Sequence, residues 1–81
     1  MPRLSVGQDQ HRALTRLGDA IRARRHDLKM SQEALADAAG INRTHMGEVE
    51  RGKRNVSLVA MMAIASALTC SLSDLVTQAK L

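Results

Sequence analysis

Aromatic residues are absent from this 81-residue sequence, which also has only one cysteine and one proline. Proteins that bind single-stranded nucleic acid normally use aromatic side chains as stacking platforms, so this mode of binding is disfavoured. The lone Cys70 excludes an internal disulfide and cannot by itself build a zinc site. The histidines, His11, His26 and His45, lack the spacing of metal ligands. We therefore expect no metal and no other cofactor.

Long hydrophobic runs are absent too. The longest, "LVAMMAIASAL", is far shorter than the ~20 residues that a membrane-spanning helix needs. The opening "MPRLSVGQDQ" lacks the apolar segment of a secretion signal. The sequence also shows no nucleophile with its base, no pair of catalytic carboxylates and no phosphate-binding glycine loop. These absences predict a cytosolic protein that is not an enzyme and does not contact a membrane.

What the sequence does contain is positive charge and aliphatic side chains. Lys and Arg outnumber Asp and Glu by 12 to 8, and the net charge of +4 favours an anionic partner, with nucleic acid ahead of a membrane surface. Hydrophobic residues make up 44% of the chain and are almost all Leu, Ile, Val, Met and Ala, a set suited to packed helices. We expect one all-α domain, close to the lower size limit for a single core.

The first third of the chain divides into an arm and a helix. Pro2, Arg3 and Gly7 predict a flexible N-terminal arm over residues 1–7, followed by a single domain over residues 8–81. Between about residues 8 and 28, apolar residues recur at helical spacing. They are Leu14, Leu17, Ile21 and Leu28. Gly18 lies inside this helix and costs roughly 1 kcal/mol relative to Ala, so the turns before it should be less firmly helical.

Two short helices follow, close together in the sequence. Ser31 predicts the N-cap of a helix that continues to about Ala39, and Gly40 has the residue type expected just after a helix. Asn42 predicts the N-cap of the next helix, which ends near Arg51.

Two more helices complete the domain. One begins after Ser57 and ends near Leu68, and its expected core face is Leu58, Met61, Ile64, Ala65 and Leu68. The last begins at Ser71, which can form a capping box with Asp74 because its hydroxyl can accept from the amide of that residue. The sequence thus predicts five helices.

The third predicted helix has two distinct faces. With about 100° of rotation per residue, Met46 and Val49 point one way, towards the expected core. The opposite face carries Thr44, Gly47, Glu48 and Arg51, with Arg43 and His45 on its flanks. This outer face is therefore polar.

These helices resemble a known DNA-binding unit. The stretch "MSQEALADAAGINRTHMGEVERGKRNVSL" resembles the helix-turn-helix of the Cro and phage-repressor family of bacterial regulators. The matching features are Ser31-Gln32, Leu35-Ala36, Gly40-Ile41, Met46 with Val49, and Glu50-Arg51-Gly52. The resemblance implies a compact five-helix lambda-repressor-like domain, with the helix-turn-helix over about residues 31–51. It also implies that the helix beginning at Arg43 enters the DNA major groove, while the helix before it crosses the backbone.

Family position and residue chemistry together imply roles for individual residues. The expected base-reading residues are Arg43, Thr44, His45 and Glu48. The expected phosphate contacts are Gln32, Arg51, Lys53, Arg54, Asn55 and Ser57. Gly47 departs from the family, which often carries another reading side chain there. It either permits close approach of the backbone to DNA or removes a contact.

The residue types fit these roles, although plainer interpretations exist. Arg43 can bond guanine O6 and N7, Thr44 can contact the thymine methyl group, and Glu48 can accept from cytosine N4. Glu48 could equally pair with Arg51, three residues later in the helix. Outside this motif, the basic run after the helix would be read as a solvated loop.

Glu50 has a structural interpretation. It lies beside the core face, and the resemblance implies that it pairs with an arginine near the end of the first helix, which is Arg25. We expect a partly buried ion pair that locks the first helix to the third. The other basic residues of this region, Arg22, Arg24 and Lys29, spread around the helix and are expected to be mostly solvated.

The fourth predicted helix carries a second apolar stripe beside its core face. The stripe consists of Val59, Met62, Ala63 and Ser66, where relatives commonly carry Glu, Thr or Lys. A helix that is apolar on nearly all sides is normally buried on nearly all sides, so we expect a twofold homodimer with this stripe at its interface, where the fifth helix could add contacts. Alternatively, the fifth helix or residues 1–7 cover the stripe within one chain.

The stretch "NRTHMGEVERGKRNVSL" looks especially like the controller proteins of restriction-modification systems, although chromosomal and prophage regulators share it. The resemblance implies a homodimeric transcriptional regulator, in the bacterial cytosol, that binds a pseudo-palindromic double-stranded DNA operator and no small-molecule ligand. The alternative is an antitoxin or adaptor module whose main partner is another protein, held by the second apolar stripe.

Overall fold

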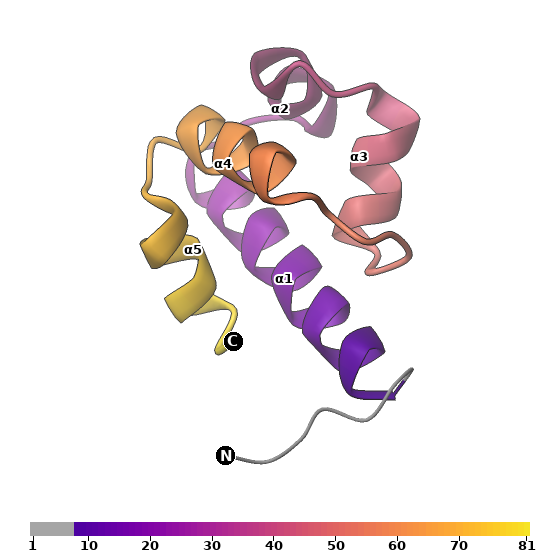
Figure 1. Ribbon diagram of the computed structural model, residues 1–81. Helices are drawn as coiled ribbons and strands as arrows, with labels where there is room; N and C mark the ends of the chain where they lie inside the picture. Colours follow the sequence, from indigo (N-terminus) through magenta and orange to yellow (C-terminus); the bar gives the residue numbers. More distant parts are fainter. Residues whose placement is uncertain (1–7) are drawn as a thin grey trace.

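The computed structural model describes residues 8–81, so the arm expected at residues 1–7 lies outside the described residues. Residues 8–81 form five α-helices and no strand. The helices are α1 (Gln8–Asp27), α2 (Gln32–Ala39), α3 (Arg43–Glu50), α4 (Leu58–Ala67) and α5 (Leu72–Gln78). In Figure 1, α1 runs through the middle of the molecule, with α3 on one side and α5 on the other. The predicted all-α fold and the order of its helices are confirmed.

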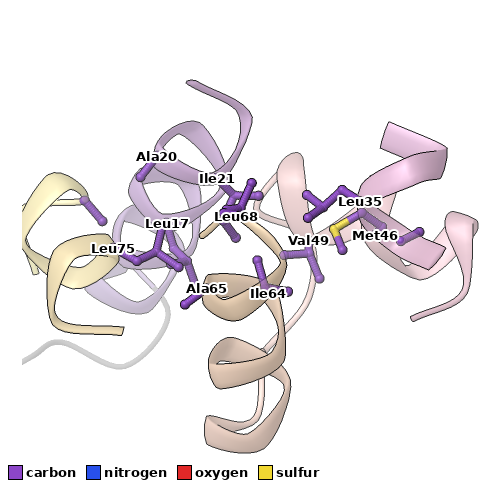
Figure 2. Close-up of a cluster of buried hydrophobic side chains, with 12 residues drawn as sticks. Leu17, Ala20, Ile21, Leu35, Met46, Val49, Ile64, Ala65, Leu68 and Leu75 are labelled. Atoms are coloured by element: carbon purple, nitrogen blue, oxygen red, sulfur yellow. The ribbon is translucent and has the colours of Figure 1, made fainter. Parts of the chain in front are cut away.

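The helices close around one hydrophobic core. Their main contacts form a ring, in which α1 packs on α3, α3 on α2, α2 on α4, α4 on α5, and α5 again on α1. Figure 2 shows that every helix sends side chains into the centre of this ring. The core consists of Leu17, Ala20, Ile21, Leu35, Ala36, Met46, Val49, Ile64, Ala65, Leu68, Leu75 and Ala79. Because α3 contributes only Met46 and Val49, its opposite face remains outside the core.

Side-chain caps define where four of the helices begin. A side-chain oxygen of the N-cap residue accepts from the amide three residues later in each case. The N-cap residues are Ser31 for α2, Asn42 for α3, Ser57 for α4 and Ser71 for α5. Asp74 completes a capping box, and hydrogen bonds from the Ser71 backbone amide and hydroxyl lower the pKa of its carboxyl. Gly40 ends α2 with a φ of 69°, which turns the chain sharply towards α3.

Helix α1 continues through Gly18, from Gln8 to Asp27. A Cβ atom at Gly18 would lie 2.4 Å from the backbone oxygen of Glu50 and 2.7 Å from that of Val49. A Cβ at Gly52, which has a φ of 70°, would lie 2.8 Å from the Cα of Thr15. The glycines therefore let the end of α3 rest directly on the backbone of α1, and this contact explains a glycine in the middle of a helix.

Two expectations for individual side chains were wrong, and a third side chain, Arg24, departs from what was expected for most of the basic residues around it. Leu28 is 38% exposed because α1 ends at Asp27, so the helical face does not continue to it. Leu58 is 62% exposed because it is the first residue of α4 and precedes the part of the helix that packs on the core. Arg24 is not simply solvated: its Nε donates to the backbone oxygen of Leu68 at 3.1 Å. This bond satisfies a carbonyl at the end of α4, where helices leave acceptors without partners.

No single helix within residues 8–81 is long and apolar enough to cross a membrane. Helices α4 and α5 would reach that length and hydropathy only as a pair, and they are bent by 94° relative to each other. The same residues contain no group of three or more His, Cys, Asp or Glu that could hold a metal ion.

Candidate nucleic-acid interface

The outer face of α3 is positioned by contacts on the opposite, buried side of the helix. The side chains of Met46 and Val49 are buried in the core, and Met46 packs with Leu35 from α2 in the same cluster. At the start of α3, the Asn42 side chain accepts from the backbone amide of His45 at 3.0 Å. Helices α2 and α3 therefore pack together as one unit, with α3 at the edge of the molecule (Figure 1) and its polar residues Arg43 and Thr44 exposed.

The residues expected to read bases occupy the first turns of α3. Arg43 and Thr44 are exposed, whereas His45 and Glu48 are half-buried. The Arg43 guanidinium lies 3.8 Å from the carboxylate of Glu33, but both side chains are about two-thirds exposed, and such a pair holds Arg43 only weakly. Arg43 is thus free to reach a partner beyond the protein surface.

Glu48 pairs with Arg54 and not with Arg51, which was the alternative expected from the sequence. The Oε1 of Glu48 lies 3.3 Å from the Nη2 of Arg54. The positive φ of Gly52 turns the chain back after α3, and the Lys53 amide then donates to the backbone oxygen of Glu48 at 2.9 Å. This turn brings the basic loop alongside α3, which a spacing rule for continuous helices cannot predict.

The expected phosphate contacts lie at the start of α2 and in the loop between α3 and α4. Within this loop Arg51, Lys53, Arg54, Asn55 and Ser57 are exposed. The Oδ1 of Asn55 accepts from Gln10 of α1 at 2.8 Å, which ties the loop to the rest of the domain. Gln32 is half-buried, and its Nε2 donates to the Oε1 of Glu50 at 3.2 Å. The exposed cations of this loop therefore border the outer face of α3.

Gly47 lies in the middle of that face and is nevertheless buried. The Nη1 of Arg51 lies 3.1 Å from the point that a Cβ at Gly47 would occupy, and the Oε1 of Gln32 lies 3.4 Å from it. An open hollow here is lined by Gln32, Arg43, Thr44, Gly47 and Arg51. The sequence placed Gly47 and Arg51 on the same face, four residues apart, and in the structure the Arg51 side chain lies over Gly47.

A buried ion pair connects α3 to α1. The Nε and Nη2 of Arg25 donate to the two carboxylate oxygens of Glu50, at 2.8 and 2.9 Å. The remaining Nη1 of Arg25 donates to the backbone oxygen of Met30 at 3.0 Å, and Gln32 donates to the same carboxylate. Both side chains of the pair are buried. This network joins α1, α3 and the start of α2, so it fixes the orientation of the α3 outer face.

A second surface lies on α4. Val59 is 76% exposed and Met62 is 54% exposed, and exposed Leu58 adjoins them; we call these residues the α4 patch. Of the other residues in the expected stripe, Ser66 is exposed and Ala63 is half-buried. Helix α5 packs on α4 but leaves the α4 patch open, so the expected alternative in which α5 covers it is wrong. The alternative cover by residues 1–7 lies outside the described residues.

Comparisons with known proteins agree on one family. A profile described as helix-turn-helix matches residues 21–75. Control protein C.SmaI of Serratia marcescens is 40% identical over 62 residues, which span 76% of this chain and 74% of that protein. The crystal structure of the restriction-modification controller protein C.AhdI from Aeromonas hydrophila superposes with a TM-score of 0.75 at 42% identity, covering 76% of this chain and 94% of that one. The crystal structure of the clp gene regulator ClgR from Corynebacterium glutamicum superposes with a TM-score of 0.82 at 29% identity, covering 84% of this chain and 72% of that one.

Proposed function

This chain belongs to the helix-turn-helix family of DNA-binding regulators, and we propose that it binds a pseudo-palindromic DNA operator as a homodimer. The family is one of regulators and not of enzymes. The chain is homologous to the controller proteins of restriction-modification systems, and we propose that it controls such an operon. A regulator of bacterial DNA acts in the cytoplasm, which is the location we propose.

One observation carries the DNA-binding proposal. Helix α3 has a buried inner face and an outer face on which Arg43 and Thr44 are exposed, next to a basic loop that contains Lys53 and Arg54. A rigid helix of this kind fits the DNA major groove, where its side chains meet base edges while flanking cations meet phosphates. The base-reading set in this proposal is Arg43, Thr44, His45 and Glu48. The phosphate-contacting set is Gln32, Arg51, Lys53, Arg54, Asn55 and Ser57.

The exposed α4 patch supports the homodimer. Three large apolar side chains are exposed on the first two turns of α4, and contiguous exposed apolar surface is a feature of interaction sites. A second copy of the chain would cover them by twofold symmetry, and it would place two α3 helices about one DNA turn apart, ~34 Å. The same patch is the one feature that favours the alternative function, an antitoxin or adaptor bound to a different protein.

Selection of bound sites from a library of random duplex DNA tests the proposal. We expect an inverted repeat whose half-sites are about 10 base pairs apart, and an affinity that falls steeply with salt because several phosphate contacts release counterions. Recovery of no preferred sequence would contradict the proposal. Co-purification of an unrelated protein with a chain that selects no DNA sequence would favour the adaptor function instead.

A further inference from the structure

The Arg51 side chain covers position 47, where the family often carries a reading side chain. Residue 47 lies on the outward face of α3, together with Thr44 and Glu48, yet as a glycine it presents only backbone. The Arg51 guanidinium fills this place, with Nη1 3.1 Å from where a Cβ of residue 47 would be. This contact explains why Gly47 is buried on a face that is otherwise open to solvent.

The direction of helical side chains accounts for this arrangement. A side chain at the end of a helix leans towards the N-terminus and covers the turn before its own Cα, so Arg51 covers the residue four positions earlier. A Cβ at position 47 would require the guanidinium to move by a few tenths of an ångström, because 3.1 Å is closer than an ordinary van der Waals contact. None of the ion pairs recorded within residues 8–81 involves Arg51. Arg51 is exposed, and no ion pair occupies the donors of its guanidinium.

The position of this guanidinium differs from that of the loop cations. It borders the hollow that Gln32, Arg43 and Thr44 also line, at the centre of the α3 outer face. Lys53 and Arg54 lie beyond the end of the helix, and Arg54 is turned towards Glu48. In a helix-turn-helix the N-terminal residues of the recognition helix meet base edges. Arg51 is the C-cap of α3, but its guanidinium reaches back over Gly47 and towards that end of the helix.

We propose that Arg51 reads a base and that Gly47 is the residue that permits it to do so. The guanidinium, lying where a side chain of residue 47 would be, donates two parallel hydrogen bonds to O6 and N7 of a guanine in each half-site. The Nε2 of Gln32 donates to Glu50, and the Oε1 of Gln32 lies 3.4 Å from the Cβ position of residue 47, so this oxygen and the guanidinium both border that position. This inference rests on the proposed function, and it moves Arg51 from the phosphate-contacting set to the base-reading set.

The test uses the full chain and the operator obtained from a random duplex library. Each base pair of the selected half-site is changed in turn, and affinity is measured for wild type, Arg51→Ala, Arg51→Lys and Lys53→Ala. For Arg51→Ala, we expect the preference for one guanine to fall by roughly tenfold or more, with the other positions still discriminated. Arg51→Lys should lose the same preference, because an ammonium keeps the charge but not the planar bidentate donor. Lys53→Ala should weaken all sequences alike.

Gly47→Ala gives a second measurement that does not remove the arginine. The added methyl group should displace the guanidinium and reduce the preference at the same guanine, while melting of the free protein should shift to equal or higher temperature. In the Arg51→Ala background the same substitution should cause no further loss of preference. A uniform loss of affinity in Arg51→Ala that Arg51→Lys restores would overturn the inference, because that is the behaviour of a phosphate contact. If the wild-type chain itself selects no sequence, the proposed function fails and this inference fails with it.

Discussion

Gly18 and Glu50 touch through their backbones, since a Cβ on Gly18 would lie 2.4 Å from the Glu50 carbonyl oxygen. The side chain of Glu50 then reaches Arg25, about two turns further along α1. The last residue of α3 is thus attached to α1 twice, once through the main chain and once through an ion pair. The face that α3 presents outward is set by these contacts, which lie on its opposite side.

Gly18→Ala should destabilise the protein because the new methyl group would overlap backbone atoms, which cannot rotate away as a side chain can. Overpacking of this kind costs about 1–3 kcal/mol. For a domain of this size, each kcal/mol lowers Tm by roughly 4–8 °C. Circular dichroism at a helical wavelength is the suitable measurement, since the chain has no aromatic residue to report by fluorescence.

Gly47→Ala is the matched control, because it makes the same change in the same helical conformation. The nearest atoms there belong to the flexible side chains of Arg51 and Gln32. Alanine favours helix by about 0.5–1 kcal/mol relative to glycine, so this variant should melt at the same or a higher temperature. Equal destabilisation by both substitutions would show that the backbone contact at Gly18 is not the cause.

Glu50→Gln should lower stability and DNA affinity together. The substitution preserves shape but leaves the buried Arg25 guanidinium without a counter-charge, and loss of one partner from a buried pair costs about 3–5 kcal/mol. We expect Tm to fall by more than about 10 °C. Glu33→Gln is the control, because the Glu33 to Arg43 pair is exposed and should contribute less than about 1 kcal/mol. An unchanged Tm and affinity in Glu50→Gln would refute a locking role for the pair.

Much of the fold could be predicted because its signals are local. The caps at Ser31, Asn42, Ser57 and Ser71 each depend on an oxygen and an amide three residues apart, and the structure has all of them. The inner face of α3 was likewise visible in the spacing of its apolar residues. Such signals do not depend on how the helices pack.

The remaining features depend on partners that are distant in the sequence. Whether Gly18 weakens a helix or admits another backbone depends on what lies against it, and no residue near Gly18 indicates α3. Arg24 looked solvated because its partner, the carbonyl of Leu68, belongs to the C-cap residue of a helix that starts more than 30 residues later. The Arg25 to Glu50 pair was expected only through family resemblance, since spacing alone does not connect α1 to α3.

Val59→Glu combined with Met62→Glu should convert the dimer into a monomer. Both side chains are exposed in the single chain, so the charges cost little there, but a twofold interface would bring like charges together in an apolar contact. Light scattering at increasing protein concentration measures the mass directly. Ala38→Glu, at an exposed position of α2, is the control and should leave the mass unchanged. Wild-type mass in the double variant would exclude the α4 patch as the interface.

Arg43→Ala and Lys53→Ala should separate base reading from phosphate contact within one surface. Arg43 stands on the first turn of α3, exposed and only weakly paired, where a bidentate contact to guanine is possible. Its removal should cost about 1–3 kcal/mol on the preferred operator and abolish discrimination at one base pair, with little effect on unrelated DNA. Lys53 lies beyond the helix, and its removal should weaken binding to operator and unrelated DNA alike and reduce the dependence of log K on log salt by about one.

Titration of both variants against operator and scrambled duplexes at several salt concentrations measures the two effects separately. If Arg43→Ala merely reduced the salt dependence, Arg43 would be a phosphate contact, and the reading surface would shift towards Thr44 and the α3 residues after it.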